Sequence, residues 1–469
     1  MVKITFYGGV NEIGGNKILL EDRDTKIFLD FGMSFSQVGK YYAEFLQPRT
    51  CNGLGDLIEL GIVPDIQGIY RNDLLCNEGR PLTKKPIIDA VFLSHAHADH
   101  SWHVSLLHPD IPIFCGATAK LILQASQETS QGTYYTDFFF YRENFVNRFR
   151  KPKEERNYKT FRTGDKIKIK DIEVEPIHVD HSIPGAYGFL VHTSEGCIAY
   201  SGDLRFHGRR TSMTKHFAEA CKEAKPIAML LEGTNIDDRI GSLSERQVYN
   251  NVQKIINNTK KLCLINFPLR DVDRLNTFLK ATKRSDRRLA VNMKQAYLIE
   301  LLNERDKKLG MPSINEFDIF INRTSWGRYE ERDYYNWQRP FLKYDNAVKA
   351  EEISKKQNKF VVFIDFFTLK ELIDIKPSAG SVFIYSMTEP FNEEMEIDFG
   401  RMMNWLNRFK MNLKHAHASG HANGKELKEI AEFVKPDKIF PIHTDKPEMF
   451  KKIIKGNIIL PELNKSYKF

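Results

Sequence analysis

The chain has few cysteines and lacks the common motifs of covalent catalysis. Its six cysteines, at positions 51, 76, 115, 197, 221 and 263, never form a C-x-x-C pair, which argues against a disulfide framework and against a thiolate zinc site. The sequence has no G-x-S-x-G elbow and no Walker phosphate-binding loop. We therefore expect reduced, structural cysteines and no covalent enzyme intermediate.

Long hydrophobic runs are also missing. No apolar stretch approaches the roughly 18 residues that a membrane-spanning helix needs. Residues 1–9 form a strand-like segment without the layout of a signal peptide. We therefore expect a cytoplasmic protein without a membrane partner.

The composition is typical of a folded protein with more than one core. Of the 469 residues, 42% are apolar and 28% are charged, and a chain of this length is expected to form two domains. The net charge of +8 favours a polyanionic partner, although many mildly basic proteins of this size bind none.

Short strand-like segments open the chain. Residues 3–7, 16–21 and 26–30 are rich in β-branched or aromatic residues and are separated by glycine-rich or charged turns, a pattern that predicts a sheet built from hairpins. The glycine pairs at 8–9 and 14–15 lack the complete dinucleotide-binding fingerprint, so tight turns are the preferred interpretation.

The middle of the chain predicts a separate α/β unit. Helix-like segments at 245–259, 272–284 and 294–309 alternate with strand-like segments. Such alternation is typical of a largely parallel sheet. The predicted strands are residues 261–266, 289–292, 360–366 and 381–385.

The most specific motif is H-x-H-x-D-H, which follows the apolar run 89–93. It comprises His95, His97, Asp99 and His100. Three imidazoles and a carboxylate within six residues are suitable ligands for a first-row metal, and Asp99 and His100 can reach a second ion beside the first. A merely polar loop would require three of the chain's 14 histidines to gather by chance.

Further histidines and aspartates follow other predicted strands. Asp30 ends the strand 26–29, a position suited to orienting a ligand histidine or a metal-bound water from behind. His181 is a candidate third protein ligand of the first ion, with His178 and Asp180 as competitors for that role.

Two more residues could complete a second metal position. Asp203 follows an apolar strand, and its carboxylate could bridge two cations because each oxygen can bind one. His443 closes the strand 438–442 and would join Asp99 and His100. The competing interpretation is a surface-turn aspartate for Asp203 and an ordinary exposed histidine for His443, but together they favour a dinuclear site.

This set of residues resembles the signature of the metallo-β-lactamase superfamily. Its members in chain order are Asp30, the block from His95 to His100, His181, Asp203 and His443. The resemblance implies an α/β fold, in which an αββα sandwich holds the metals at one edge of its two sheets.

Three further motifs resemble those of the β-CASP nucleases. Glu232 lies in a segment similar to their motif A, His421 in one similar to motif B, and His443 in one similar to motif C. The resemblance implies a β-CASP domain inserted in the sandwich. The predicted division is residues 1–236, 237–412 and 413–469, where the first and last segments form the metallo-β-lactamase domain.

Within these nucleases the chain is most similar to the ribonuclease J group, including its archaeal-type members. The glycine-rich opening at 8–16 and the block 181–184 carry this likeness. The chain departs from the group at 101–103 and in residues 33–77. We also expect it to lack the long C-terminal extension of the bacterial members. We expect Tyr41, Tyr42, Arg49, Tyr70 and Arg71 to line the cleft and alter substrate choice.

The resemblance implies a metal-dependent ribonuclease that hydrolyses RNA phosphodiester bonds with water activated by two metal ions. The products would carry 5′-phosphates, and cleavage would proceed from the 5′-end, internally or both. Two Zn²⁺ ions are expected, with Mn²⁺ or Mg²⁺ as possible working ions. One ion would be held by His95, His97, His181 and Asp203, and the other by Asp99, His100, His443 and Asp203.

The remaining roles concern the substrate, which we expect to be single-stranded RNA. His421, oriented by Glu232, would supply a proton to the leaving 3′-oxygen. The hydroxyl of Ser386 and the backbone amides near Ser419 and Gly420 would bind a phosphate. A basic run (Lys280, Lys283, Arg284, Arg287 and Arg288) contacts either the nucleic acid or only solvent at a helix end.

Alternatives stay open at this stage. A DNA nuclease of the same family would use the same metal chemistry. A scaffold that binds nucleic acid and has lost activity is a further alternative of a different class, and a homodimer is possible. A hydrolase of small esters or lactams would leave Glu232 and His421 without a role.

Overall fold

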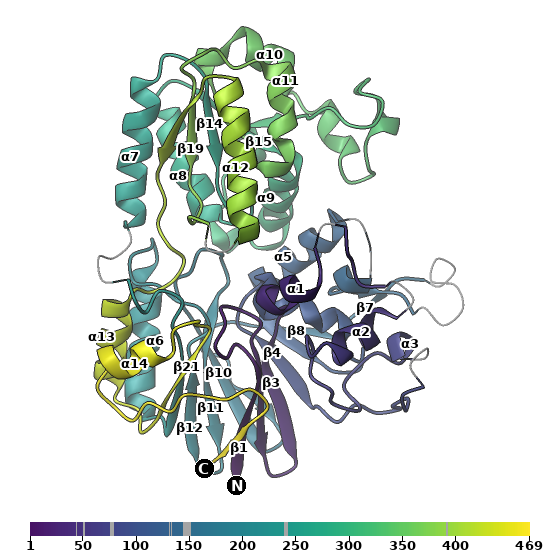
Figure 1. Cartoon of the computed structure of the whole chain (residues 1–469), viewed down its shortest axis with the longest axis vertical. Coiled ribbons are helices and arrows are strands. Elements are labelled where there is room, and N and C mark those ends of the chain that lie inside the picture. The colour runs from purple at the N-terminus through teal and green to yellow at the C-terminus, as the bar shows by residue number, and fades with distance from the viewer. Residues whose placement is uncertain are drawn as a thin grey trace. The chain divides into compact units, whose positions relative to one another are not determined.

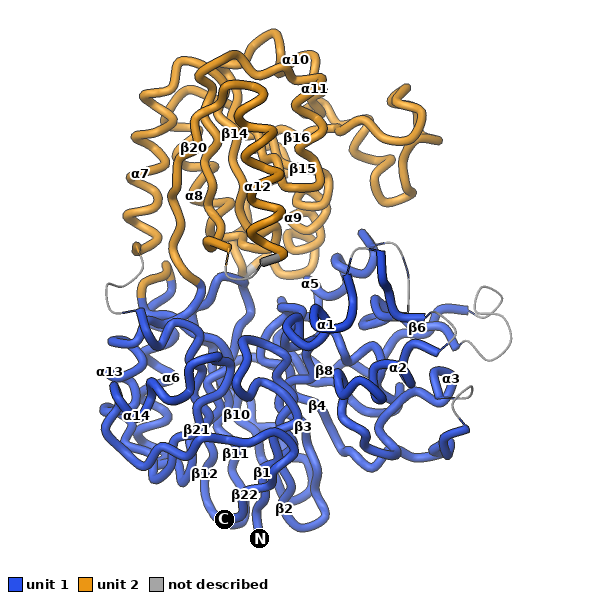
Figure 2. Tube along the Cα trace, in the orientation of Figure 1, with its two compact units in different colours: residues 1–206, 210–241, 420–469 blue, residues 207–209, 242–419 orange. Residues whose placement is uncertain are grey.

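The structure is a computed structural model, which describes residues 1–43, 45–49, 52–75, 79–130, 132, 134–143, 152–238, 243–390 and 393–469. The chain forms two compact units (Figures 1 and 2). Unit 1 comprises residues 1–206, 210–241 and 420–469, and unit 2 comprises residues 207–209 and 242–419. The boundaries expected from the sequence lie somewhat earlier, at 236/237 and 412/413, and that division stays a prediction.

Two large β-sheets form the frame of unit 1. One has the strand order β22 (Ser466–Lys468), β1 (Val2–Gly8), β2 (Lys17–Asp22), β3 (Thr25–Phe31), β4 (Ala90–Leu93), β5 (Ile113–Gly116) and β8 (Tyr158–Phe161). The other has the order β21 (Ile439–Ile442), β13 (Ala228–Glu232), β12 (Gly196–Tyr200), β11 (Tyr187–Thr193), β10 (Ile172–His178) and β9 (Ile167–Ile169).

The two sheets share one hydrophobic core. Ile4 and Phe6 on alternate positions of β1 point to the same face, because side chains alternate along a strand. They pack in one buried cluster with Phe189 of β11 and Phe440 of β21, and the rings of Phe6 and Phe440 lie 5.6 Å apart. The apolar alternation of the sequence thus produces a sandwich.

Helices cover the outer faces of the sandwich. The helices α6 (Thr211–Ala224), α13 (Gly424–Val434) and α14 (Glu448–Ile453) bury apolar side chains against the second sheet. The helix α5 (Ala117–Glu128) packs on β5 and β8 of the first sheet. The expected αββα fold is confirmed, including the antiparallel hairpins of β1, β2 and β3.

Shorter elements complete unit 1. They are α1 (Phe35–Tyr41), α2 (Gly53–Glu59), α3 (Asn72–Leu75), α4 (Ala98–Ser101), η2 (Trp102–Leu106), η3 (Tyr134–Thr136), β6 (Phe140–Tyr141) and β7 (Glu154–Glu155). Cys115, Cys197 and Cys221 are buried and free, as is Cys263 of unit 2. Cys51 and Cys76 lie outside the described residues.

The segment 33–77 corrects one expectation. Tyr70 is 2% exposed and Arg71 is 1% exposed, so neither side chain is available to a substrate. Tyr70 donates to the carbonyl oxygen of Pro64, and Arg71 pairs with Asp73 at 2.7 Å and with Asp137 at 3.2 Å. Both residues therefore hold the segment together. Asn77, at its end, lies outside the described residues.

Unit 2 is built on a parallel sheet. Its strand order is β17 (Ala347–Val348), β16 (Asp318–Phe320), β15 (Arg288–Asn292), β18 (Phe360–Phe363), β14 (Cys263–Asn266), β19 (Val382–Tyr385) and β20 (Asn412–His415). All neighbouring strands in this order run parallel. The expected α/β domain with a parallel sheet is confirmed.

Helices lie on both faces of this sheet. One face carries α7 (Glu245–Asn258), α8 (Val272–Lys283) and α9 (Met293–Arg305). The opposite face carries α10 (Ala350–Lys355), α11 (Leu372–Ile375) and α12 (Glu393–Arg408). Short 3₁₀ turns are η5 (Lys307–Leu309), η6 (Ile314–Glu316), η7 (Glu331–Asp333), η8 (Arg339–Lys343), η9 (Gln357–Lys359) and η10 (Phe366–Glu371).

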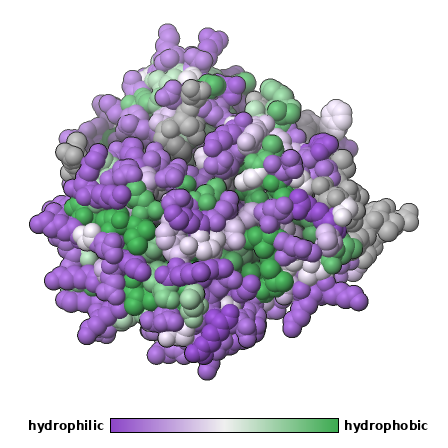
Figure 3. All heavy atoms as spheres, turned by 60° about the horizontal axis from the view of Figure 1, so that its bottom comes forward, coloured by the Kyte–Doolittle hydropathy of each residue, from purple (hydrophilic) through white to green (hydrophobic). Residues whose placement is uncertain are grey.

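Polar side chains dominate the face of the molecule that Figure 3 draws. Smaller hydrophobic patches interrupt them. Among the residues that the structure describes, no helix combines the length and the apolar character needed to cross a membrane.

Candidate metal centre

The predicted metal ligands of unit 1 follow the carboxyl ends of strands. The H-x-H-x-D-H block follows β4, His181 follows β10, Asp203 follows β12, and His443 follows β21. The strands β12, β13 and β21 run parallel, so their carboxyl ends meet at the same edge of the sheet. Loops at such an edge commonly form binding sites.

One group consists of His95, His97, His181 and Asp203, whose ligand atoms all lie within 4.8 Å of one another. Nδ1 of His97 lies 3.0 Å from Nε2 of His95 and 3.1 Å from Nε2 of His181. Oδ2 of Asp203 lies 3.6 Å from Nε2 of His95 and 3.7 Å from Nε2 of His181. Three nitrogens and one carboxylate therefore face a common point.

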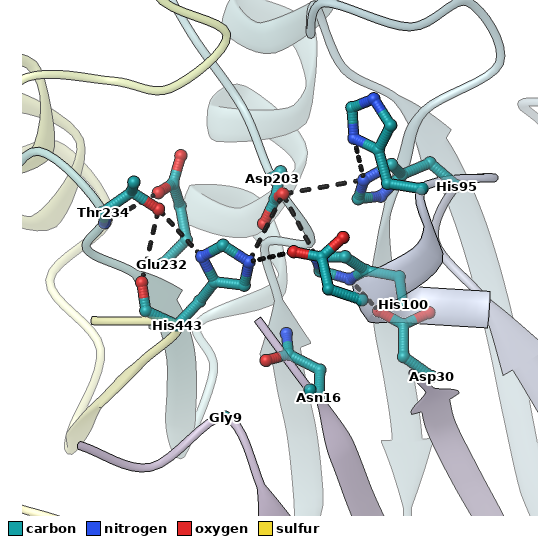
Figure 4. Close-up of polar contacts among 12 residues, drawn as sticks. Gly9, Asn16, Asp30, His95, His100, Asp203, Glu232, Thr234 and His443 are labelled. Atoms are coloured by element: carbon teal, nitrogen blue, oxygen red, sulfur yellow. Dashed lines mark hydrogen bonds and ion pairs between the residues drawn. The ribbon is translucent and has the colours of Figure 1, made fainter. Parts of the chain in front are cut away.

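A second group consists of Asp99, His100 and His443, again within 4.8 Å. Oδ2 of Asp99 lies 3.2 Å from Nε2 of His443 and 4.0 Å from Nε2 of His100. Oδ2 of Asp203 reaches the same two nitrogens at 3.7 and 3.1 Å. Figure 4 shows Asp203 between His95, His100 and His443. Asp203 is thus the residue that the two groups share.

The protonation states of His95, His181 and Asp203 suit a cation. Burial, together with neighbouring imidazoles, lowers the pKa of His95 and of His181 well below the usual value, so both rings are neutral and keep a lone pair. Burial raises the pKa of Asp203, but the imidazoles of His100, His443 and His421 outweigh this effect and hold it well below its usual range. Asp203 is therefore ionised.

The contacts within the cluster also fit a metal. A single nitrogen of His97 faces one nitrogen from each of two other imidazoles, and one shared proton cannot satisfy three nitrogens. Asp203 Oδ1 is buried and has no hydrogen-bond partner among the described residues. Divalent cations bound by imidazole and carboxylate would satisfy all these atoms.

A buried network orients the ring of His100. Its Nδ1 lies 2.7 Å from Oδ2 of Asp30, so an N–H donated there leaves Nε2 for a metal. Asp30 also accepts from the amide and hydroxyl of Ser94 and from the hydroxyl of Tyr200. Asn16 donates to Tyr200 at 3.0 Å. Asp30 thus has the position expected from the sequence, whereas no sequence pattern pointed to these roles of Tyr200 and Asn16.

Other ligands are oriented in the same way. His181 Nδ1 donates to the carbonyl oxygen of Gly420 at 2.6 Å. Thr234 Oγ1 lies 2.8 Å from Nδ1 of His443, and the backbone amide of His443 donates to Gly9 at 2.8 Å. His443 adopts a left-handed φ of 53°, a strained conformation that these contacts maintain. Thr234 was missed because it lies far from His443 in sequence.

Glycines allow the chain to pass close to Asp99. A Cβ added at Gly14 would lie 2.6 Å from the Cβ and from Oδ2 of Asp99. One added at Gly32 would lie 1.7 Å from the Asp99 carbonyl oxygen. The amide of Asn16 donates to that oxygen at 3.1 Å. The glycine-rich opening therefore packs directly against a predicted ligand.

His421 and Glu232 lie beside the two groups. Nδ1 of His421 is 3.3 Å from Oε2 of Glu232 and 3.9 Å from Oδ2 of Asp203. Glu232 is fully buried and accepts from the amides of Leu204 and Thr234 at 3.2 and 3.1 Å. These amides fix the carboxylate that faces the imidazole. Together with His443, these residues form a third group of potential metal ligands.

The competitors of His181 have other partners. His178 packs against Tyr187 with the two rings tilted by 31° and their centroids 3.9 Å apart, and its Nδ1 lies 2.9 Å from the hydroxyl of Thr163. Asp180 pairs with Arg205 at 3.1 Å. Neither belongs to a group of potential metal ligands among the described residues.

The residues predicted to bind phosphate belong to different units. Ser386, in unit 2, is buried, contacts Arg274 and donates to the carbonyl oxygen of Ala416. Ser419, also in unit 2, accepts from His207 at 3.0 Å through its carbonyl oxygen. Gly420 is in unit 1. Phosphate binding by these residues stays a prediction.

The basic run of unit 2 is largely engaged within that unit. Lys283 pairs with Glu316 at 2.6 Å, and Arg288 pairs with Asp318 at 2.5 Å. Arg287 donates to the carbonyl oxygen of Lys261. These contacts within the unit argue against the interpretation of the run as a contact to nucleic acid.

Comparisons with known proteins agree with this arrangement. Residues 63–240 match a model described as beta-lactamase superfamily domain. Residues 408–456 match one described as Zn-dependent metallo-hydrolase RNA specificity domain.

Two curated relatives and one solved structure illustrate the similarity. Ribonuclease J of Mycoplasma genitalium is 24% identical over 453 residues, which cover 94% of this chain and 67% of that protein. Ribonuclease J of Pyrococcus abyssi is 27% identical over 254 residues, which cover 52% of this chain and 48% of that protein. A crystal structure of a protein of unknown function from Enterococcus faecalis V583 matches with a TM-score of 0.77 and 24% identity, covering 99% of both chains.

Proposed function

The chain belongs to the metallo-β-lactamase superfamily and is related to ribonuclease J, and on this premise we propose that it is a metal-dependent ribonuclease. The proposed reaction is hydrolysis of RNA phosphodiester bonds that leaves 5′-phosphates, by 5′-exonucleolytic cleavage, endonucleolytic cleavage or both. The match to an RNA specificity domain at residues 408–456 favours RNA over DNA as the substrate.

The observation that carries the proposal is the position of Asp203. Its Oδ2 lies 3.1 Å from Nε2 of His100 and 3.6 Å from Nε2 of His95, and these two histidines belong to different groups of potential ligands. A carboxylate shared in this way supports a site for two cations.

We assign His95, His97, His181 and Asp203 to one ion and Asp99, His100, His443 and Asp203 to the other. The donor set contains no thiolate, and imidazole with carboxylate suits Zn²⁺ while allowing Mn²⁺. When bound, two such ions would lower the pKa of a water molecule and neutralise phosphate charge.

The chain's own residues supply orientation and a proton. Glu232 holds the imidazole of His421 through Nδ1, which leaves Nε2 as the nitrogen that can donate a proton to the leaving 3′-oxygen. Asp30 fixes His100, the Gly420 carbonyl oxygen fixes His181, and Thr234 fixes His443. The ligands are therefore pre-oriented for the substrate, which we propose to be single-stranded RNA.

The test is cleavage of matched single-stranded RNA and DNA, each with a 5′-phosphate or a 5′-hydroxyl. The wild type, His97→Ala and the control His192→Ala are compared with Zn²⁺ or Mn²⁺. His192 is a partly exposed histidine of β11 outside the cluster. RNA cleavage that is lost only in His97→Ala would support the proposal.

The other outcomes separate the alternatives. Mononucleotides released from 5′-phosphorylated RNA would indicate an exonuclease, whereas internal fragments would indicate an endonuclease. Cleavage of DNA alone would reassign the substrate. Binding without metal-dependent cleavage of any of the four substrates would replace the ribonuclease with an inactive scaffold.

A further inference from the structure

An irregular segment of unit 2 presents a tryptophan to solvent. Residues 322–349, here called the arm, follow β16, contain η7 and η8, and end with the short sheet strand β17. Trp326 in the arm is 82% exposed. An exposed aromatic side chain contributes little of the free energy that burial of its ring would provide. Packing within the unit therefore does not explain this tryptophan.

The backbone around Trp326 is strained. Ser325, Gly327 and Tyr329 have φ values of 46°, 70° and 60°, all in the left-handed region. Serine and tyrosine adopt this region at a cost in free energy, because their Cβ approaches the backbone. Strain of this kind persists only where other contacts hold it, and it often marks a functional segment.

Asp333 holds the strained turn in place. Its carboxylate accepts from the backbone amides of Trp326 at 3.3 Å, Arg328 at 2.8 Å and Glu330 at 3.4 Å. Its carbonyl oxygen accepts from the hydroxyl of Thr324 at 2.7 Å. The turn is therefore a built structure, with Trp326 and Arg328 on either side of Gly327.

Two cations lie against the ring of Tyr329 in the arm, and one of them, Arg323, also pairs with Asp374 at 3.5 Å. Nζ of Lys349 lies 4.4 Å from the ring centre of Tyr329, and the guanidinium of Arg323 lies 5.7 Å from it. Arg328 and Lys349 are exposed, and among the described residues neither forms an ion pair. In contrast, Arg332 pairs with Glu330 at 2.7 Å.

An exposed tryptophan in a segment with two exposed cations that form no ion pair among the described residues matches the chemistry of a single nucleic acid strand. Bases stack on aromatic side chains, and cations neutralise the phosphates between them. We propose that the arm binds single-stranded RNA, with a base stacked on Trp326 and phosphates at Arg328 and Lys349. The inference rests on the proposed function for the choice of RNA, and it adds a contact outside the metal cluster.

The primary test measures binding of a fluorescently labelled single-stranded RNA of 20 nucleotides. Trp326→Ala, Trp326→Phe and the control Phe367→Ala are each placed in a His97→Ala background, so that the RNA stays intact. Phe367 is 83% exposed on η10 of the same unit. We expect Trp326→Ala to raise Kd about 10-fold, as expected for one lost stacking contact. Trp326→Phe keeps an aromatic ring, so its Kd should stay near that of the His97→Ala protein. The same is expected of Phe367→Ala.

Arg328→Ala provides a second, independent readout. Loss of one phosphate contact should reduce the slope of log K against log salt concentration by about 1. Circular dichroism and thermal melting establish that each variant is folded, and the exposed position of both side chains favours this. An unchanged Kd in Trp326→Ala together with an unchanged salt slope in Arg328→Ala would overturn the proposal.

The outcomes for the arm and for the enzyme are distinguishable. RNA cleavage by the wild type with unchanged binding by Trp326→Ala would refute the arm's role and leave the ribonuclease standing. Weaker RNA binding by Trp326→Ala, together with no RNA cleavage by the wild type, would support the arm's role and refute the ribonuclease. Light scattering that shows a lower mass for Trp326→Ala, with RNA binding unchanged, would instead assign the arm to contact with a second copy of the chain.

Discussion

His421 Nδ1 lies 3.3 Å from Oε2 of Glu232, in a position where the carboxylate controls the charge of the imidazole. Burial lowers the pKa of His421, but the negative charges of Glu232 and Asp203 outweigh burial and raise it to about 9. The imidazole is therefore protonated at neutral pH. This is the state that a proton donor to a leaving oxygen needs.

Replacing Glu232 with glutamine should shift the alkaline limb of the pH profile. A proton donor loses activity as the pH rises through its pKa, and loss of the neighbouring negative charge lowers that pKa. We expect the decline of kcat/KM in Glu232→Gln to begin at lower pH than in the wild type. The measurement is kcat/KM between pH 6 and 10, with Glu175→Gln, on β10 beside His192, as control. Coincident alkaline limbs would exclude the proton-donor role.

Replacing Asp203 with asparagine should affect both metal positions at once. The amide keeps the shape of the side chain but removes the negative charge that faces His95, His100, His181 and His443. We expect lower metal content per chain by elemental analysis and a loss of activity of at least about 100-fold, beyond that seen for residues that only orient ligands.

Two controls make this experiment specific. Asp171→Asn changes a partly exposed carboxylate that pairs with Arg23 and should retain the full metal content. A chelator should lower the Tm of the wild type more than that of Asp203→Asn, because a ligand stabilises only the protein that binds it. If Asp203→Asn held as much metal per chain as Asp171→Asn, the assignment of Asp203 as a metal ligand would be contradicted.

The sequence predicted the parts of the site that local patterns encode. The H-x-H-x-D-H block places His95, His97, Asp99 and His100 together because they lie within six residues. The strand-like segments predict sheets with polar residues just after the strand ends. The αββα sandwich was expected from the resemblance to the metallo-β-lactamase superfamily. The structure brings all seven predicted ligands together.

The parts that depend on distant contacts could not be predicted. Tyr200 reaches Asp30 across 170 residues, and Thr234 reaches His443 across 209 residues. A tyrosine in an apolar strand gives no signal that its hydroxyl serves a buried carboxylate. The role of Arg71 was also missed, because its partner Asp137 lies in a separate segment whose fold has no clear periodicity.

Gly14→Ala should disturb the metal site without unfolding the protein. The new Cβ would lie 2.6 Å from Asp99, so Asp99 must move. The control is Gly164→Ala, since Gly164 also has a left-handed φ, 96°, but no atom lies within 4 Å of its added Cβ. We expect both variants to lose about 1–2 kcal/mol of stability from backbone strain, and only Gly14→Ala to lose metal affinity in a titration. Equal metal affinity would show that the site tolerates the displacement.

Arg274 of unit 2 should contribute far more to stability than an exposed arginine. It is fully buried, and its guanidinium donates to both carboxylate oxygens of Glu245 at 2.7 and 3.3 Å and to the Ala418 carbonyl oxygen at 3.1 Å. Arg274→Met would leave the charge of Glu245 buried without its partner, which costs about 3–5 kcal/mol.

Urea unfolding of the metal-loaded protein tests this expectation. The control is Arg401→Met, because Arg401 pairs with Asp398 on the surface of α12 and should cost less than about 1 kcal/mol. The double variant Arg274→Met/Glu245→Leu should recover part of the loss, since it also removes the buried charge. If the double variant were less stable than Arg274→Met, the cost would lie in the packing around Arg274 and not in the unpaired carboxylate.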